Sequence, residues 1–318
     1  MQPWASLRSF AVPALTLAIV SFLAKVLPVY YTGLLTQMLI FGIFAMSLNL
    51  LLGYTGLPSF GHAAYFGAAA YATAIFSLRV INNFWIDGLA GLMASVMSAA
   101  LFGLLALRTS GAYFLMITLA IAQVLAGVAV GWEDVTGGTD GLPGILRPKL
   151  GAIFPWSLAD GATFFYFTLI IFVIVAGAIY VLVRSPFGYA LQGIRENESR
   201  MRALGYNVWL YKYVAFITAG FFAGIGGVLF VYYNSFVNTS ALGIPLSGEG
   251  LLMVVLGGAG TFLGPVIGAG SLVFLRYTIS AYTERWELVL GVIFVLVVLF
   301  APRGIMGAMR TRPQRMKK

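Results

Sequence analysis

The chain has 318 residues, of which 60% are hydrophobic and only 9% are charged, whereas soluble domains carry about 25% charged residues. This composition cannot cover a water-soluble globule with polar side chains, so it predicts an all-α polytopic membrane protein in lipid. The net charge of +9 does not indicate nucleic-acid binding, because the basic residues gather in loops beside apolar segments, and the lack of cysteine excludes disulfides and thiolate metal sites.

Apolar segments that could cross a membrane recur along the chain. A helical crossing needs about 20 apolar residues, so we expect about 8 to 10 transmembrane helices. The first segment resembles a signal peptide, but others follow it directly, which favours an uncleaved span. Glycine and proline interrupt two late segments, which predicts discontinuous helices that line a path. The segments are 10–28, 32–52, 61–78, 88–107, 112–131, 161–183, 211–233, 248–260, 264–281 and 287–302.

The positions of lysine and arginine predict the orientation. Most of the 19 basic residues fall on one side if the chain starts inside and crosses an even number of times, and cytoplasmic loops carry the excess of basic residues. We therefore expect one transmembrane domain over 1–318 with both termini cytoplasmic. Its parts are a cytoplasmic N-terminus (1–9), an external loop (132–160), a cytoplasmic loop (184–208) and a basic cytoplasmic tail (303–318).

The loop 184–208, here called the polar island, carries six charges between spans that have none. Ser185-Pro186 can start a short helix, and Gly205 can end it in the left-handed conformation. Its apolar residues are spaced roughly as one face, and they are Ala190, Leu191, Ile194, Met201 and Leu204. This pattern is typical of a helix that docks on another protein, and a solvated loop is the alternative.

Small residues four positions apart predict where helices pack closely. Such pairs let backbones approach one another in a membrane, and they are Gly220/Gly224, Ala223/Gly227 and Gly264/Gly268.

No catalytic or metal-binding motif is present. His62 is the single histidine, which excludes two-histidine zinc motifs, and no Gly-Lys dipeptide exists to form a phosphate-binding loop. We therefore expect no catalytic residue, no metal ligand and no nucleotide site in this chain.

Two glycine-rich stretches and one carboxylate are candidates for a translocation path. Residues 53–67 contain too many helix breakers for a plain helix yet lie between spans, and a tight turn is the alternative. A lone histidine is more often a packed polar residue. Glu249 is ionisable near membrane depth, which favours function, although simple solvation is equally compatible. The candidates are Gly56, Ser59, Gly61, His62, Glu249, Gly257, Gly258 and Gly260.

The external loop contains a second glycine-rich stretch, which begins at Trp132. It can fold back tightly and present its acids outward, among them Asp134 and Asp140.

Several motifs together resemble one family. They are Ser47-Leu-Asn-Leu-Leu-Leu-Gly-Tyr-Thr-Gly, Ser59-Phe-Gly-His-Ala-Ala-Tyr-Phe-Gly, Thr136-Gly-Gly-Thr-Asp-Gly-Leu, Ser185-Pro-Phe-Gly, Ile194-Arg-Glu-Asn-Glu, Ala203-Leu-Gly-Tyr-Asn-Val, Met253-Val-Val-Leu-Gly-Gly-Ala-Gly-Thr and Leu299-Phe-Ala-Pro-Arg-Gly-Ile-Met-Gly. In this order they resemble the LivM-type permease subunits of bacterial branched-chain amino acid ABC transporters.

The resemblance implies a permease subunit in the bacterial inner membrane that imports Leu, Ile or Val. Its implied partners are a second homologous permease, two ABC ATP-binding subunits that hold ATP and Mg, and an extracytoplasmic solute-binding protein. This chain itself would hold no cofactor. The polar island would be a cytoplasmic coupling helix that contacts the ATPase, and the external loop, with Asp134 and Asp140, would receive the binding protein. The coupling residues that match are Gly188, Arg195, Glu196, Glu198 and Gly205.

Other functions remain open at this point. Urea and short-chain amide systems share much of the pattern. An ion-coupled secondary transporter could use broken helices and Glu249, but it leaves the polar island without a role. A channel or a structural membrane protein accounts for still less.

Overall fold

The computed structural model describes residues 28–148, 157–300 and 304–310. In this part of the chain, five helices are long and apolar enough to cross a membrane, and they are Tyr30–Thr55, Phe84–Ala106, Ala112–Gly131, Gly161–Arg184 and Val208–Asn234. The expectation of an all-α polytopic membrane protein is confirmed. The predicted N-terminus, the span 10–28 and much of the basic tail lie outside the described residues.

The helices follow the predicted apolar segments to within a few residues. Glycine follows the last residue of η1 and α11, and proline stands in the first turn of α8, α11 and α12. The elements are α2 (Val29–Asn49), η1 (Leu50–Thr55), α3 (His62–Arg79), α4 (Phe84–Ala106), α5 (Ala112–Gly131), α6 (Glu133–Thr136), β1 (Leu142–Pro143), α7 (Gly161–Arg184), α8 (Pro186–Glu196), α9 (Glu198–Ala203), α10 (Val208–Asn234), β2 (Phe236–Val237), η2 (Thr239–Leu242), α11 (Ile244–Gly257), α12 (Gly264–Ser280), α13 (Trp286–Phe300) and α14 (Gly304–Arg310).

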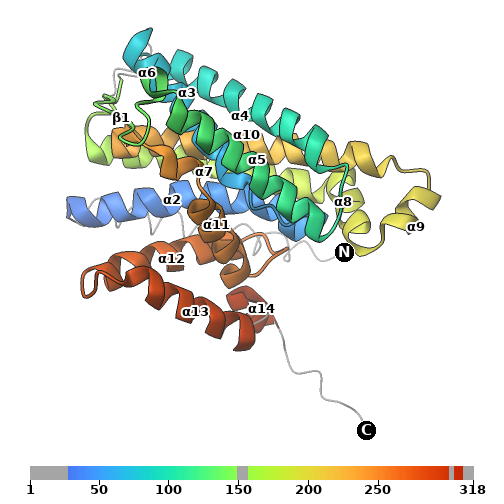
Figure 1. Cartoon of the computed structure of the whole chain (residues 1–318). Helices are drawn as coiled ribbons and strands as arrows, with labels where there is room; N and C mark the ends of the chain where they lie inside the picture. The colour runs from blue at the N-terminus through green and yellow to red at the C-terminus, as the bar shows by residue number, and fades with distance from the viewer. Residues whose placement is uncertain (1–27, 149–156, 301–303, 311–318) are drawn as a thin grey trace, which may run out of the picture.

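Helix α2 and the π-helical turn η1 that continues it form the centre of the bundle. The most apolar stretch of this pair is 83% buried, compared with 22% for α5. Figure 1 shows α2 between α4 and α5 on one side and α12 and α13 on the other. Aromatic rings fill the space around it, including Phe44, Phe66 and Phe216, which are fully buried. A central helix that is apolar all round is expected where neighbours cover every face.

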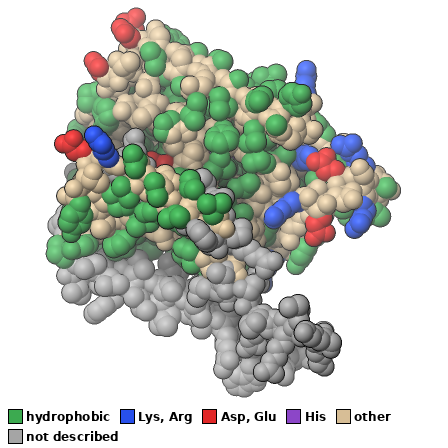
Figure 2. All heavy atoms as spheres, turned by 60° about the horizontal axis from the view of Figure 1, so that its bottom comes forward, with side chains coloured by type: hydrophobic (Ala, Val, Ile, Leu, Met, Phe, Trp, Pro, Cys, Tyr) green, Lys and Arg blue, Asp and Glu red, His purple; other side chains and the backbone are tan. Residues whose placement is uncertain are grey.

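Charged side chains gather at two ends of the molecule, and the surface between them is mostly apolar (Figure 2). The polar island lies at one end, whereas α6 and β1 lie at the other (Figure 1). Large apolar side chains are exposed along the outer helices, as Met97 on α4 and Val124 on α5 illustrate. This band of exposed apolar surface is what a lipid-facing protein requires.

The small-residue pairs mark close helix contacts, as predicted. A methyl group at Gly227 on α10 would lie 2.1 Å from the carbonyl oxygen of Phe66 on α3. At Gly268 on α12 it would lie 1.8 Å from the carbonyl oxygen of Met253 on α11. At Gly220 and Gly224 it would lie 2.3 Å and 2.7 Å from the Cβ atoms of Ala99 and Ser95 on α4. These glycines allow backbone-to-backbone packing that any side chain would prevent.

The broken segment near the C-terminal part of the chain is also confirmed. Helix α11 has only 14 residues, and the chain then leaves helical geometry before α12 begins at Gly264. Gly258 and Gly260, with φ of 114° and 79°, make this break possible.

Candidate functional site

The polar island starts and ends at the predicted residues but contains two helices. The Ser185 hydroxyl accepts a hydrogen bond from the Gly188 amide (3.3 Å), with Pro186 in the first turn. Asn197 leaves helical geometry (φ −159°), and its side chain accepts from the Arg200 amide (2.9 Å) to start α9. Gly205 follows α9 with φ of 87°. The single helix predicted here was wrong, because an asparagine side chain competes with helical hydrogen bonds.

The apolar face of the island packs against its own chain. Ala190, Ile194 and Met201 are buried together with Val208 at the start of α10. Leu191 enters the main core. Leu204 was expected on the same face, but it is 67% exposed because α9 has already ended. The island is therefore a packed element with one outward face, and Figure 1 shows it projecting from the bundle.

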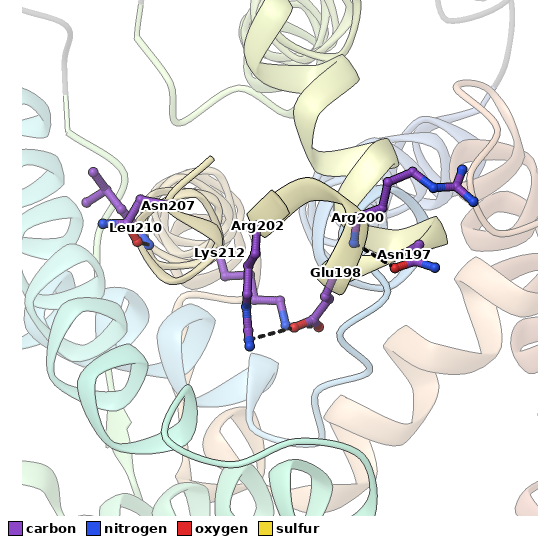
Figure 3. A network of polar contacts seen from close by, with 7 residues as sticks. All are labelled: Asn197, Glu198, Arg200, Arg202, Asn207, Leu210 and Lys212. Carbon is purple, nitrogen blue, oxygen red and sulfur yellow. Dashed lines mark hydrogen bonds and ion pairs between the residues drawn. The ribbon is translucent and has the colours of Figure 1, made fainter. Parts of the chain in front are cut away.

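Glu198 holds the island to α10. One carboxylate oxygen pairs with the Lys212 ammonium, and the other lies 3.4 Å from the Arg202 guanidinium, so that Glu198 sits between two cations (Figure 3). The Lys212 side chain is 11% exposed, compared with 67% for Arg202. The inner pair is the stronger one, because solvent screens it less. Among the described residues, the neighbouring Glu196 is exposed and forms no ion pair.

Arg195 is exposed at the end of α8 and lies against the end of the bundle. Its guanidinium donates to the carbonyl oxygen of Gly53 in η1. A methyl group at Gly56 would lie 3.0 Å from the Arg195 Cγ, and one at Gly260 would lie 2.8 Å from its terminal nitrogen. The side chain of Arg195 therefore passes over the end of η1 and ends against the break between α11 and α12. Two predicted path residues, Gly56 and Gly260, and one predicted coupling residue come together here.

The local sequence explains why the Gly53 carbonyl is available. In η1 the Leu57 amide donates to Leu51 (2.9 Å) instead of to Gly53. The next residue is Pro58, which has no N–H to offer. A buried carbonyl that has lost its helical partner needs another donor, and Arg195 supplies it.

Asn49 joins the same cluster and was not among the predicted site residues. Its amide nitrogen donates to the carbonyl oxygen of Thr261 (2.9 Å), and its amide oxygen accepts from the Gly260 amide (2.9 Å). The side chain is 2% exposed. The available signal was an asparagine inside a charge-free span, where a polar side chain requires a partner.

His62 is packed inside the bundle. Its Nε2 lies 2.8 Å from the Ser47 hydroxyl, which itself donates to the Phe44 carbonyl. Its ring lies 5.3 Å from that of Phe44 and 5.5 Å from that of Tyr65, and it is fully buried. These contacts favour the reading of a packed polar residue over one that lines a path.

Ser59 and Gly61 shape the turn that precedes α3. The Ser59 hydroxyl accepts from the Gly61 amide (3.2 Å), and Ser247 on α11 accepts from the Ala63 amide (3.0 Å). A methyl group at Gly61 would lie 2.6 Å from the Thr118 carbonyl oxygen. The start of α3 is thus enclosed by α5 and α11.

Glu249 lies 3.5 Å from the guanidinium of Arg276 on α12. The pair joins the two helices of the broken segment, and pairing with a cation lowers the cost of a partly buried carboxylate. Gly257 and Gly258 lie at the end of α11, where a methyl group on Gly257 would lie 1.8 Å from the Gly264 carbonyl oxygen.

A buried carboxylate, Asp87 at the start of α4, was also missed. It is fully buried, accepts from the Tyr232 hydroxyl (2.9 Å) and from the Asn83 amide (3.1 Å), and so ties α4 to α10. In the sequence, Asp87 looks like a solvated residue of a loop, because the contact that buries it comes from Tyr232 on the distant helix α10.

A cavity of about 180 Å³ adjoins the Arg195 cluster. It is lined by Tyr54, Tyr180, Val183, Arg184, Gly260, Thr261 and Phe262. The Arg184 guanidinium stacks over the Tyr180 ring at 4.2 Å. The cavity opens beside the island, at the end of the bundle where α7 meets α8.

At the opposite end, the glycine-rich loop folds back as predicted. Gly137, Gly138, Gly141 and Gly144 all have positive φ. Asp134 and Asp140 are exposed. Arg79, at the end of α3, donates to the backbone carbonyls of Asp134 and Val135, which leaves the acidic side chains facing outward.

Arg147 anchors the end of this loop. Its guanidinium donates to the carbonyl oxygens of Tyr232 (2.8 Å) and Tyr233 (3.0 Å) at the end of α10 and lies over the Phe164 ring. Burial lowers the pKa of Arg147. A cation at a helix C-terminus stabilises the last carbonyl groups.

Comparison of the sequence with known protein families identifies the family of this chain. The model of the family described as branched-chain amino acid transport system / permease component matches residues 30–299. The chain belongs to this family. It is 30% identical to the high-affinity branched-chain amino acid transport system permease protein LivM of Salmonella typhimurium over 300 residues, covering 88% of this chain and 70% of that protein. LivM of Escherichia coli is 29% identical over the same shares.

A relative of a second kind is also similar. The probable branched-chain amino acid transport permease protein LivH of Methanocaldococcus jannaschii is 26% identical over 294 residues, covering 82% of this chain and 87% of that protein. The family resemblance inferred from the sequence motifs is confirmed, and the chain is a multi-pass membrane permease.

Proposed function

We propose that this chain is the membrane-spanning subunit of an ATP-driven importer for branched-chain amino acids. The observation that carries the proposal is the polar island, a packed helical element at one end of an apolar bundle whose outward face bears charges. Such an element offers a docking surface to a partner that hydrolyses ATP, which this chain cannot do without a phosphate-binding loop.

The proposed assembly contains this permease, a second homologous permease, two ABC ATP-binding subunits that bind ATP and Mg, and an extracytoplasmic solute-binding protein. The island would face the bacterial cytoplasm, and the loop with Asp134 and Asp140 would face the binding protein. Support for the second permease comes from the similarity of one chain to relatives named LivM and LivH. Support for the orientation comes from the basic residues at the island's end.

An ion-coupled secondary transporter is the alternative of a different class. It would require an ionisable group that titrates or holds a cation during transport. Glu249, the candidate for that role, is paired with Arg276, and among the described residues no three His, Asp or Glu side chains come together to hold a metal ion. These observations favour energy from a partner protein.

The test is uptake by the purified complex reconstituted in vesicles. We expect radiolabelled leucine, isoleucine or valine to enter only when ATP and the binding protein are supplied, and uptake to survive ionophores that collapse proton and sodium gradients. The ATP-binding subunits should co-purify with the chain. Uptake driven by an ion gradient without nucleotide would contradict the proposal. Uptake of urea but of no branched-chain amino acid would show that the chain is instead a permease of a urea transporter.

A further inference from the structure

We propose that Arg195 mechanically links the polar island to the two broken elements of the bundle, namely η1 and the break at 258–263. This inference rests on the proposed function and deepens it, because it identifies the contact through which movement of the island would reach the interior. Arg195 is here a positioning residue that acts through backbone groups.

The first step is the contact itself. Helix α8 contacts η1 through the guanidinium of the exposed Arg195, which donates to the carbonyl oxygen of Gly53 in a partly buried hydrogen bond. That carbonyl has no helical partner, because the Leu57 amide is used by Leu51 and Pro58 has none. A buried carbonyl bound by a charged donor is held strongly, since charge-assisted hydrogen bonds are about twice as strong as neutral ones.

The second step is the presence of glycine at the three positions that lie closest to Arg195 and to the contact between the two breaks. Methyl groups at Gly56 and Gly260 would lie 3.0 Å and 2.8 Å from Arg195 atoms, and a methyl group at Gly53 would lie 2.4 Å from the Gly260 amide nitrogen. Glycine at all three positions lets backbone, guanidinium and backbone stack in direct contact. The side chain of Arg195 from α8 thus contacts both η1 and the break at 258–263.

The third step is the connection between the two breaks. Asn49 binds both the Gly260 amide and the Thr261 carbonyl (2.9 Å each), and it lies directly before η1. Displacement of η1 is therefore passed to the break at 258–263 through the side-chain amide of Asn49. Arg195 thus adds a charged hydrogen bond to the apolar packing by which α8 already contacts the bundle.

The link can be tested by distance measurements in the full chain, without its partners. The sequence contains no cysteine, so spin labels attach only at introduced ones. Tyr189→Cys on α8 and Leu263→Cys in the break are suitable sites, since these residues are 64% and 37% exposed. The pair Tyr189→Cys and Leu210→Cys reports separately on the docking of α8 against α10.

In lipid nanodiscs, we expect Arg195→Met to broaden the 189–263 distance distribution and to leave the 189–210 distribution unchanged. Arg195→Lys retains a charged donor and should stay closer to the unsubstituted chain. Gly260→Ala, which changes no charge, should broaden the 189–263 distribution as Arg195→Met does. Arg200→Met on the exposed face of α9 is the matched control. An unchanged 189–263 distribution, or equal broadening of both pairs, would overturn the link.

In the assembled transporter, Arg195→Met should keep ATP hydrolysis and lower solute uptake at least tenfold, whereas Arg285→Met, at an exposed site in the turn before α13, should not uncouple the two. Uptake of Arg195→Met equal to that of the unsubstituted complex would overturn the link. Failure of ATP-binding subunits to co-purify with the unsubstituted chain would instead count against the proposed function and leave the distance result standing.

Discussion

The Asn49 amide nitrogen donates to the carbonyl oxygen of Thr261, 212 residues further along the chain, at 2.9 Å. This bond and its companion from the Gly260 amide close a break in one helix against the end of another. Two glycine-rich interruptions that are far apart in sequence thus form one structural unit. The unit lies beside the polar island, through which we propose that the energy of ATP hydrolysis arrives.

Asn49→Leu is expected to destabilise the protein by up to about 6 kcal/mol, because two partly buried backbone groups lose their partner and each unsatisfied buried group costs about 1–3 kcal/mol. Thermal unfolding of the purified chain in detergent measures the effect. Asn234→Ala is the matched control, since the Asn234 side chain is exposed and bonds only to the Phe230 carbonyl of its own helix. Equal melting temperatures for the two variants would contradict this role of Asn49.

Gly227→Ala should destabilise the contact between α10 and α3. The added methyl group would lie 2.1 Å from the Phe66 carbonyl oxygen, and overpacking of this kind costs about 1–3 kcal/mol. Gly177→Ala on α7 meets no neighbouring atom within 4 Å and should instead stabilise the helix by up to about 1 kcal/mol. Opposite shifts of the unfolding midpoint are expected, and equal shifts would show that the small-residue stripe does not determine packing.

The sequence predicted those features that depend on local chemistry. Gly205 ends the island because this position needs the left-handed conformation, which glycine adopts without strain. Gly268 marks a close contact because two helix backbones can approach each other only at small residues. Apolar length predicted the limits of the spans.

The features that were missed depend on distant partners. Three such features are the contact of Arg195 with the Gly53 carbonyl, the partners of Asn49 and the pairing of Glu249 with Arg276. Each arises between segments that lie far apart in the chain. The break at Asn197 was missed for a different reason. An asparagine can either remain in a helix or cap the next one, and the tertiary packing of Met201 against α10 decides between these outcomes.

Glu198→Gln is expected to lower stability more than Arg202→Ala. Removal of the Glu198 charge leaves the Lys212 ammonium nearly buried and without its ion-pair partner, which we expect to cost about 1–3 kcal/mol. Loss of the exposed Arg202 pair should cost about 0.2–1 kcal/mol. Chemical denaturation of both variants provides the comparison. A double variant, Glu198→Gln with Lys212→Met, should recover part of the loss, and no recovery would show that the pair is not the source of the effect.

Asp134→Lys combined with Asp140→Lys should slow productive docking of the binding protein without affecting assembly with the ATPase. Exposed charges act mainly on the association rate and are screened by salt, so the defect should shrink as the ionic strength rises. Binding-protein association with vesicle-embedded complexes measures the rate. Glu284→Lys, at an exposed site in the turn before α13, is the control. An unchanged rate at low salt would remove this loop from the docking surface.

The last prediction separates the outward charge of the island from its geometry. Glu196→Arg should weaken contact with the ATP-binding subunits, because reversing a charge at a desolvated contact costs several kcal/mol, whereas a freely solvated charge costs close to nothing. Gly205→Val should disturb coupling by another route, since a β-branched residue resists φ of 87° and misdirects the entry into α10.

Gly205→Asn is the matched variant, because asparagine tolerates the left-handed conformation. ATP hydrolysis and solute uptake are measured on the same reconstituted complexes. We expect Glu196→Arg and Gly205→Val to lose stimulated uptake and Gly205→Asn to keep most of it. If Glu196→Arg retains full stimulation and uptake, the outward face of the island is not in contact with the ATPase, and the packed inner face alone accounts for its conformation.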